Sequence, residues 1–478
     1  MKIKNICCIG AGYVGGPTMA VIADKCHDIK IEVVDLNQER IDLWNDENLD
    51  NLPIYEPGLA KIVKRCRGKN LSFSTLVKEK IENADMIFIS VNTPTKKNGI
   101  GAGKASDLKW VEACSRQVAK YAKGYTIVVE KSTLPVRTAE VIKSILEASQ
   151  EQKNIESNGN ITFDVLSNPE FLSEGTAIND LLNPDRVLIG GDSNEAMQAL
   201  GNIYANWVPK NKILKTNIWS SELAKLTANA FLAQRISSIN SISALCENTG
   251  ADVREVSRAI GTDSRIGSKF LDSGPGFGGS CFKKDILNLV YLANYFGLPE
   301  VANFWEGVVT LNNWHQKRIA NLIAKKLFGT LSNKKIAILG FAFKANTNDT
   351  RESAAINICK DLLEEGAILK IHDPKVSEEQ ISKDLNRTPL NINDVNNSSY
   401  DKNIEASWIF CPDIYDVFSE TDAVLVLTEW KEYSSIDWER VSKKMRKPSW
   451  VFDARSILDP EKIINCNLNL WRIGDGSK

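Results

Sequence analysis

Residues 3–35 read IKNICCIGAGYVGGPTMAVIADKCHDIKIEVVD, and their apolar runs are interrupted by Gly10-Ala11-Gly12-Tyr13-Val14-Gly15. The pattern predicts a strand from Ile3 to Ile9, a helix from Pro17 to Ala23, and a strand from Ile31 to Val34 that ends on Asp35. A strand, a GxGxxG turn, a helix and a second strand with a terminal acid form the dinucleotide-binding pattern. These residues predict an α/β domain built on a doubly wound, mainly parallel sheet.

Each residue of this pattern has a physical task. Gly10 allows the tight turn, Gly12 lets the backbone approach a pyrophosphate, and Gly15 lets the helix pack closely on the strand. Asp35 would accept hydrogen bonds from ribose hydroxyls, which favours NAD because its charge repels the 2′-phosphate of NADP. Arg40 nearby keeps NADP open as the alternative.

The alternation of apolar strands and helices continues along the chain. Strands are predicted over residues 85–91, 125–129, 165–167 and 187–190. Ligands bind at the carboxyl ends of the strands in such a sheet. We therefore expect the segments after these strands to lie close together over the cofactor, with Thr93, Thr133, Glu170 and Glu174 among their residues. Ordinary turn chemistry is the alternative, because Asn-Pro and Thr-Pro pairs are common in loops. The polar stretch 150–160 is expected to be a surface loop.

A long apolar run from Thr216 to Asn248 has helical spacing, and Gly250 follows as a stop. A helix of this length and apolarity joins two domains or forms the seam of a dimer. Lys225 and Asn229 lie four residues apart, so they share one helix face. Lys225 belongs to a solvated face in one interpretation and points at a ligand in the other.

Gly274-Pro275-Gly276-Phe277-Gly278-Gly279-Ser280-Cys281 places four glycines close together, so its backbone can approach a ligand. Ser280 is a good N-cap, and the apolar spacing after it predicts a helix with Cys281 in the first turn. A helix N-terminus favours the thiolate, which makes Cys281 a candidate nucleophile, and Asp285 shares its helix face. A glycine loop with a buried, inert cysteine is the alternative.

The second half of the chain repeats the order of the first. Strands are predicted over 335–339 and 369–372, and the segments 421–427 and 450–456 parallel 83–89 and 128–132. Ala342 and Ala345 stand where the second and third glycines would be, and their methyl groups hinder a full dinucleotide. We expect a second Rossmann-like unit that grips a different nucleotide through Lys344 and Arg455; a purely structural duplicate is the alternative.

Length and composition narrow the classes of function. The chain has 478 residues, 43% of them apolar, which predicts three domains over 1–215, 216–328 and 329–478. A net charge of −1 gives no electrostatic case for nucleic acid or an anionic membrane, and no apolar stretch of about 18 residues or signal peptide is found. Ten cysteines without metal-type spacing fit reduced thiols in the cytoplasm. With only three histidines, no metal site is expected.

A cysteine nucleophile beside a redox cofactor can hold an aldehyde as a thiohemiacetal, which is oxidised to a thioester and hydrolysed. The chain resembles the UDP-glucose/GDP-mannose dehydrogenase family, above all its eukaryotic members that oxidise UDP-glucose. The resemblance covers nearly the whole length through the motifs GAGYVGGPT, SVNTPT, EKSTLPVR, SNPEFLSEGTA, NPDRVLIGG, GFGGSCFKKD, GFAFK and NDTRES. It implies two Rossmann-like domains joined by a central long-helix domain, and the four-electron oxidation of UDP-glucose to UDP-glucuronate with NAD.

The resemblance also implies roles for the matching residues. Cys281 would be the nucleophile, and the other catalytic residues would be Lys225, Asp285, Glu170, Thr133 and Asn229, with the proton transfers not divided among them. Arg351 would reach the cofactor of a neighbouring subunit. NAD would contact Gly10, Gly12, Tyr13, Val14, Gly15, Asp35, Arg40, Val91, Asn92, Thr93, Pro94, Thr95, Ser132, Thr133, Glu174, Lys284 and Arg351. The UDP-sugar would contact Glu170, Phe171, Leu172, Lys225, Asn229, Arg265, Phe277, Gly278, Phe343, Lys344 and Arg455.

Self-association through the central helix is implied as well, as a dimer or a hexamer. The segment after Lys344 and the short tail differ from animal members of the family, which favours the dimer. The nearest alternative function is that of a sister enzyme acting on GDP-mannose or a UDP-N-acetylhexosamine, because the glycine and cysteine motifs are shared. A non-catalytic NAD-binding protein and a single-step, 6-phosphogluconate-like dehydrogenase are disfavoured by Cys281 and by the second nucleotide unit.

Overall fold

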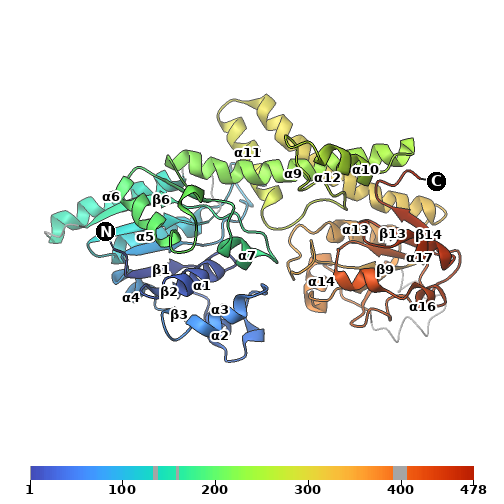
Figure 1. Ribbon diagram of the computed structural model, residues 1–478, viewed down its shortest axis with the longest axis horizontal. Helices are drawn as coiled ribbons and strands as arrows, with labels where there is room; N and C mark the ends of the chain where they lie inside the picture. Colours follow the sequence, from blue (N-terminus) through green and yellow to red (C-terminus); the bar gives the residue numbers. More distant parts are fainter. Residues whose placement is uncertain (1, 133–137, 158–160, 391–405, 478) are drawn as a thin grey trace. The chain divides into compact units, whose positions relative to one another are not determined.

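A computed structural model describes residues 2–132, 138–157, 161–390 and 406–477 (Figure 1). The chain divides into two compact units. The N-terminal unit comprises Met1–Ala228 with Leu287–Leu292, and the C-terminal unit comprises Asn229–Ile286 with Ala293–Lys478. None of the helices in the described ranges is both long and apolar enough to cross a membrane.

The N-terminal unit contains an eight-stranded sheet of the order β3-β2-β1-β4-β5-β6-β7-β8. All neighbouring strands are parallel except β6 and β7. The first six follow the doubly wound order that the sequence predicted. The strands are β1 (Asn5–Ile9), β2 (Lys30–Val34), β3 (Leu71–Ser74), β4 (Met86–Ile89), β5 (Tyr125–Glu130), β6 (Thr162–Ser167), β7 (Val187–Gly191) and β8 (Ile213–Thr216).

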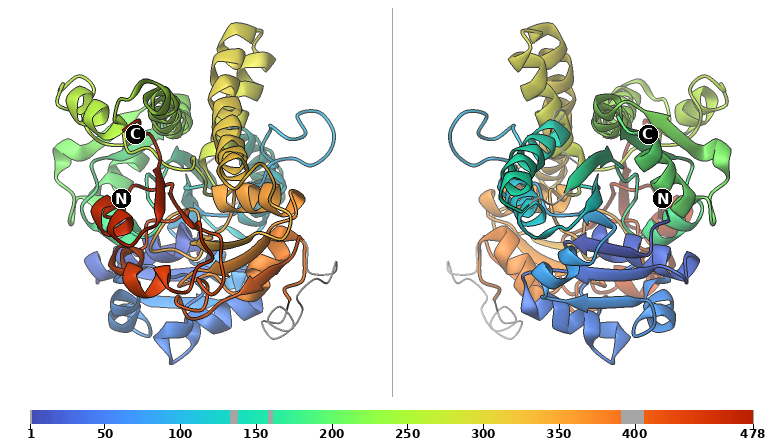
Figure 2. Two further views of the ribbon diagram at one scale, coloured as in Figure 1. Left: turned by 90° about the vertical axis from the view of Figure 1, so that its right-hand side faces the viewer. Right: turned by 90° about the vertical axis from the view of Figure 1, so that its left-hand side faces the viewer.

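Helices cover both faces of this sheet, as Figures 1 and 2 show. Ile6 and Cys8 of β1 pack into the core on one face and Cys7 and Ile9 into the core on the other, because side chains alternate along a strand. One face carries α1 (Gly15–Lys25), α2 (Gln38–Asn45), η1 (Leu49–Asn51), α3 (Leu59–Cys66), α7 (Ala177–Leu182) and α8 (Asn194–Tyr204), and the other α4 (Val77–Glu82), α5 (Lys109–Tyr121) and α6 (Thr138–Ser157). The prediction of a surface loop over 150–160 is wrong up to Ser157, because α6 continues through it.

The central helix α9 (Ile218–Thr249) confirms the predicted long helix to within two residues at its start and one at its end. The boundary between the two units falls inside it, after Ala228. A 3-10 turn, η2 (Lys210–Lys212), precedes β8 in the N-terminal unit. The helices that follow α9 are α10 (Val253–Gly261), α11 (Phe282–Tyr295) and α12 (Pro299–Lys326).

The C-terminal unit contains a second, six-stranded sheet of the order β11-β10-β9-β12-β13-β14, with every pair parallel. Counted along the chain, this is again the order 3-2-1-4-5-6, so the predicted repeat is confirmed. The strands are β9 (Lys335–Leu339), β10 (Ile368–His372), β11 (Trp408–Phe410), β12 (Ala423–Val426), β13 (Trp450–Asp453) and β14 (Asn469–Arg472). The helices are α13 (Ala354–Glu364), α14 (Glu378–Leu385), η3 (Lys431–Ser435), α16 (Trp438–Ser442) and α17 (Pro460–Asn465).

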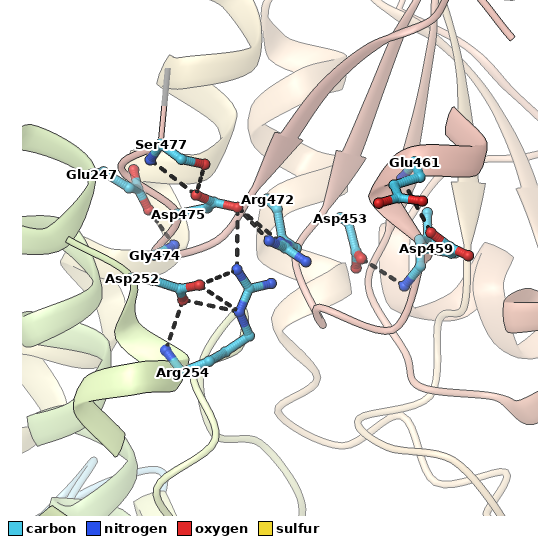
Figure 3. Close-up of polar contacts among 11 residues, drawn as sticks. Glu247, Asp252, Arg254, Asp453, Asp459, Glu461, Arg472, Gly474, Asp475 and Ser477 are labelled. Carbon is cyan, nitrogen blue, oxygen red and sulfur yellow. Dashed lines mark hydrogen bonds and ion pairs between the residues drawn. The ribbon is translucent and has the colours of Figure 1, made fainter. Parts of the chain in front are cut away.

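The segment after β14 folds back onto the junction of α9 and α10 within the same unit (Figure 3). Val253 N donates a hydrogen bond to the Gly474 carbonyl at 2.9 Å. The Asp475 carboxylate pairs with Arg254 of α10 and with Arg472 of β14. These contacts fasten the last strand of the second sheet to the central helices.

We expect Gly474→Ala to weaken this attachment. Gly474 has a φ of +68°, and a Cβ there would lie 2.3 Å from Val253 Cγ1. Left-handed backbone costs an alanine about 1–2 kcal/mol, and forcing an extra methyl into a packed site adds about 1–3 kcal/mol. Gly329→Ala is the matched control, since Gly329 has a φ of +80° and a Cβ there would meet open space. Equal losses of unfolding free energy in urea for the two variants would contradict the clash.

Candidate active site

The first glycine loop connects β1 to α1. Gly10 has a φ of +109°, and a Cβ there would lie 2.3 Å from the Ser90 carbonyl oxygen. A Cβ at Gly15 would lie 2.0 Å from the Gly10 carbonyl oxygen, whereas one at Gly12 would meet no atom of the described residues within 4 Å. Packing therefore requires Gly10 and Gly15, and Gly12 leaves the loop backbone open to a ligand.

Asp35 follows β2 and holds the same loop. Its Oδ2 accepts hydrogen bonds from Ala11 N at 3.0 Å and from the Arg40 guanidinium at 3.1 Å. The Tyr13 hydroxyl is buried and has no hydrogen-bond partner among the described residues. Open backbone, an unpartnered hydroxyl and a carboxylate fit the diphosphate and ribose of a dinucleotide.

The tails of β4 and β5 reach the edge of the sheet where this loop lies. Ser132 Oγ donates a hydrogen bond to the Val91 carbonyl at 2.8 Å, and Thr93 is buried. β4 pairs directly with β1, so its tail follows the strand beside the glycine loop. This tail contains Val91, Asn92, Thr93, Pro94 and Thr95. Thr133 lies outside the described residues.

Glu170 and Lys225 form a buried ion pair in the N-terminal unit. Lys225 Nζ lies 3.1 Å from Glu170 Oε1, and the side chains are 4% and 6% exposed. Glu170 Oε2 also accepts a hydrogen bond from Leu172 N at 2.6 Å. Burial by itself raises the pKa of Glu170, but Lys225, the Leu172 N–H and Lys131 outweigh it and hold that pKa below its usual value. The interpretation of Lys225 as part of a solvated face is therefore wrong.

Two side chains that the sequence did not single out order the segment around Glu170. Glu56 accepts hydrogen bonds from the backbone N–H groups of Gly175 and Ala177, which positions the segment that follows Glu174. The Arg186 guanidinium stacks 3.7 Å from the centre of the Phe171 ring. The Glu56 contact has no local sequence signal, because Glu56 and Gly175 are 119 positions apart.

The cysteine loop of the C-terminal unit is held by side chains of two long helices. Asn240 of α9 accepts a hydrogen bond from Gly274 N at 3.0 Å, and Asn312 of α12 accepts one from Phe277 N at 2.9 Å. His315 Nε2 lies 2.9 Å from the Gly274 carbonyl oxygen. Burial, helped by the charge of a nearby arginine, lowers the pKa of His315 to about 4, so this ring is neutral. The loop backbone is thus anchored at both its start and its middle.

The glycines of this loop make room for atoms of the protein itself. A Cβ at Gly276 would lie 2.8 Å from a side-chain oxygen of α12, and one at Gly278 would lie 2.5 Å from the Glu352 carbonyl oxygen. A Cβ at Gly279 would lie 3.1 Å from the Phe343 ring. The expectation that these glycines serve the approach of a ligand is therefore incomplete, since packing within the unit already requires them.

Cys281 lies directly before α11, which begins at Phe282, so its predicted place inside the first turn is wrong by one residue. Its carbonyl still accepts the helical hydrogen bond from Asp285 N at 2.8 Å. Eight of the ten cysteines are buried, and Cys281 is one of two that are partly exposed. Burial raises the pKa of the thiols of Cys8 and Cys114 to about 12, so these stay protonated. Cys281 combines access with a place at a helix N-terminus.

Asp285 of α11 and Asn229 of α9 are joined by a hydrogen bond inside the C-terminal unit. Asn229 Nδ2 donates to Asp285 Oδ2 at 2.6 Å, and both side chains are buried. Lys284 Nζ lies 4.0 Å from Asp285 Oδ1. The amide therefore fixes the orientation of a carboxylate one helical turn beyond Cys281.

Phe343, in the segment after β9, and Arg455, just after β13, lie against the cysteine loop. The Arg455 guanidinium donates to the carbonyls of Leu427 at 2.8 Å and Phe343 at 3.1 Å. A Cβ at Gly274 would lie 3.2 Å from this guanidinium, and Lys344 Nζ lies 5.4 Å from the centre of the Phe343 ring. The structure thus gathers around one loop the predicted substrate residues Phe277, Gly278, Phe343, Lys344 and Arg455.

The acid at the end of β10 holds the same position in the second sheet as Asp35 in the first. Asp373 Oδ2 accepts hydrogen bonds from Phe341 N at 2.7 Å and Ala342 N at 3.0 Å, and Trp430 Nε1 lies 3.4 Å from it. The side chain is 5% exposed. Its burial under Trp430 leaves no open face for a ribose, which supports the expectation that this unit does not hold a dinucleotide.

Two predicted ligand contacts point elsewhere. The Arg265 side chain is 88% exposed and pairs with Asp263 at 2.6 Å. Arg351 is half-exposed and pairs with Asp349 of its own chain, while its carbonyl accepts a hydrogen bond from Gly279 N at 2.9 Å. The contacts of Arg265 and Arg351 with ligands stay predictions.

Comparisons with known proteins agree with this geometry. The UDP-glucose/GDP-mannose dehydrogenase family is matched by its NAD-binding domain over residues 4–208, its central domain over 219–314 and its UDP-binding domain over 337–460. UDP-glucose 6-dehydrogenase 4 of Arabidopsis thaliana is 53% identical over 480 residues, which is 98% of this chain and 97% of that protein. UDP-glucose 6-dehydrogenase of Gallus gallus is 55% identical over 462 residues, which is 96% of this chain and 90% of that protein. A UDP-glucose dehydrogenase structure from Pyrobaculum islandicum has a TM-score of 0.81 at 28% identity and covers 99% and 98% of the two chains.

The buried ion pair predicts a thermodynamic coupling. Lys225→Met removes the ion-pair partner of the buried Glu170 carboxylate, so we expect it to lower the free energy of unfolding by about 3–5 kcal/mol. Adding Glu170→Gln removes that charge, so the double variant should be more stable than Lys225→Met alone. Urea unfolding of the two single variants and the double variant at pH 7 measures the coupling, and additive losses would rule it out.

The same pair predicts how this coupling depends on pH. Because the folded state lowers the pKa of Glu170, the pair stabilises above the unfolded pKa and loses its effect as pH falls through the folded pKa. The coupling should therefore shrink under acid conditions. Lys443→Met, at an exposed pair with Glu439, is the control and should leave stability almost unchanged.

Proposed function

The chain belongs to the UDP-glucose/GDP-mannose dehydrogenase family, and we propose that it acts as a UDP-glucose 6-dehydrogenase, oxidising UDP-glucose to UDP-glucuronate with NAD. The observation that carries this proposal is the identity of 53–55% to curated UDP-glucose 6-dehydrogenases over nearly the whole chain. Cys281 supports the proposal. Its thiol is partly exposed just before α11, and a four-electron oxidation through a thioester needs an accessible nucleophile.

The first glycine loop would hold NAD. Gly12 leaves backbone open beside the N-terminus of α1, where a diphosphate is favoured by the helix dipole. Asp35 would accept from the ribose hydroxyls, and Arg40 is already paired with it. Two successive molecules of NAD⁺ would each take up one of the two hydrides that the oxidation of an alcohol to a carboxylate releases.

We assign the chemistry of the sugar to residues of both clusters. Lys225 stabilises the oxyanion that forms as the 6-hydroxyl loses its proton. Loss of a first hydride from the carbon of that alkoxide gives an aldehyde. The Cys281 thiolate adds to the aldehyde carbon, and loss of a second hydride from the same carbon leaves a thioester. Glu170 and Asp285, held by Asn229, position a water that cleaves the thioester and returns the thiolate. One alcohol and one water thus yield one carboxylate, two hydrides and three protons.

The three predicted domains divide these tasks in our proposal. Residues 1–215 bind NAD, residues 216–328 carry the cysteine loop and the self-association helix, and residues 329–478 bind the UDP moiety. Four large apolar side chains of α9 are exposed, which supports a dimer through this helix: Trp219, Leu223, Phe231 and Leu245. All ten cysteines lie among the described residues and none forms a disulfide bond, which supports a cytoplasmic protein.

A panel of nucleotide sugars tests the function. We expect UDP-glucose to yield two NADH per sugar consumed, because alcohol and aldehyde are oxidised in one catalytic cycle. GDP-mannose and UDP-N-acetylglucosamine, at equal concentration, should yield little. Absorbance at the NADH band with chromatographic quantification of UDP-glucuronate gives the ratio. A ratio of one, or turnover of another sugar in place of UDP-glucose, would overturn the proposal.

The role of Cys281 has its own test. We expect Cys281→Ser to lower steady-state formation of UDP-glucuronate by at least about 1000-fold, because serine at this place is a poor nucleophile and a poor leaving group. Binding of NAD, followed by protein fluorescence, should be retained. Cys466→Ser is the matched control, since Cys466 is the other partly exposed cysteine. Full turnover by Cys281→Ser would remove this thiol from the mechanism.

A further inference from the structure

Lys131 is a buried lysine near Glu170 to which the proposed chemistry assigns no role. It follows β5 directly, its backbone N donates to the Ile89 carbonyl at 3.0 Å, and the residue is 4% exposed. Its ammonium donates hydrogen bonds to Asn168 Oδ1 at 3.0 Å and to the Tyr204 hydroxyl at 3.2 Å. It forms no ion pair with any described residue. A buried ammonium without a paired carboxylate is costly, so its presence calls for a physical reason.

The hydrogen bonds of Lys131 lead to the segment that carries Glu170. Asn168 lies two residues before Glu170, and its backbone N donates to the Glu130 carbonyl at 2.8 Å, next to Lys131. The Tyr204 hydroxyl donates to Asn168 Oδ1 at 2.7 Å. Asn168 Oδ1 therefore accepts from both Lys131 and Tyr204, and this fixes the chain at the end of β6 just before the ion pair.

The titratable groups that face Lys131 come from four elements. Glu170 follows β6, Lys225 lies on α9, Cys8 lies on β1 and Tyr204 lies on α8. Burial raises the pKa of Cys8 and of Tyr204, so both are neutral near pH 7. Burial, together with the charge of Lys225, lowers the pKa of Lys131 to about 8, while Glu170 opposes this change. Near pH 7 the facing charged groups are therefore Glu170 and Lys225.

We propose that Lys131 is a positioning residue of the reaction: its ammonium, hydrogen-bonded through Asn168 to the segment that bears Glu170, is a second positive charge behind the Glu170–Lys225 pair and keeps Glu170 ionised. The inference rests on the proposed function. Lys225 is then released from being the sole counter-charge of Glu170 and can serve an oxyanion. Without Lys131, a proton would compete for Glu170 at a higher pH.

Lys131→Gln removes the charge and keeps a hydrogen-bond donor near Asn168. We expect the ratio of its kcat to that of the wild type to fall about two- to threefold between pH 7.5 and pH 5.0, because loss of a nearby cation raises the pKa of a carboxylate by about one unit from a value that starts below the usual one. KM for UDP-glucose should change less than about twofold, since no contact with the sugar is involved. Lys131→Arg, which keeps the charge, should restore a ratio that does not depend on pH.

Lys370→Gln is the matched control. Lys370 is an equally buried lysine of β10 in the other sheet and donates to the Ser419 carbonyl. The ratio of the kcat of Lys370→Gln to that of the wild type should be independent of pH. A purely structural role of Lys131 would also give a constant ratio, and that result overturns the inference.

Asn168→Asp is the second variant, for the case that Lys131→Gln does not fold. It places a carboxylate against Lys131 and neutralises the same charge, so the same fall in the kcat ratio is expected, and a constant ratio overturns the inference. The wild type separates the two proposals. Absence of NADH formation from UDP-glucose by the wild type refutes the proposed function, whereas normal wild-type turnover with constant ratios refutes only the role of Lys131.

Discussion

Helices bury both faces of each parallel sheet, so a ligand can reach the sheet only at the edge formed by the carboxyl ends of its strands. In the N-terminal unit, β1, β4, β5 and β6 pair in register, so their tails are brought together by backbone hydrogen bonds alone. The polar side chains of the site lie in these segments, because the strands themselves are buried and apolar. Glu170 and Lys131 follow two neighbouring strands, β6 and β5. The pairing of these strands fixes the positions of both buried side chains. The chemistry of this unit is a consequence of that edge.

The two sheets show how one topology serves two ligands. Both have the order 3-2-1-4-5-6, and both place an acid after the second strand. Asp35 holds its loop and is still partly exposed, whereas Asp373 is buried, accepts hydrogen bonds from two backbone N–H groups and is covered by Trp430. A single aromatic ring and a filled hydrogen-bond shell thus separate a dinucleotide site from a site that must recognise its ligand through side chains such as Arg455.

The sequence predicted what depends on local pattern. The strands, the glycine loop, α9 and the second Rossmann-like unit follow from apolar periodicity and from backbone positions that only glycine tolerates. It did not predict Glu56 or Lys131, because their partners lie far along the chain and a lone Glu or Lys carries no signal. The end of α6 was predicted as a loop because its residues are polar, although the helix continues through them. The burial of Lys225 was left open, since only the tertiary fold places Glu170 beside it.

The cysteine loop has a consequence for redesign. Its glycines at 276, 278 and 279 are in contact with α12, Glu352 and Phe343, so none of them offers a position for a new side chain. These three glycines are therefore not usable library sites for directed evolution toward another sugar. Changes in selectivity would have to enter through the neighbours that already carry side chains, Phe277 and Phe343, while the three glycines of the loop stay unchanged.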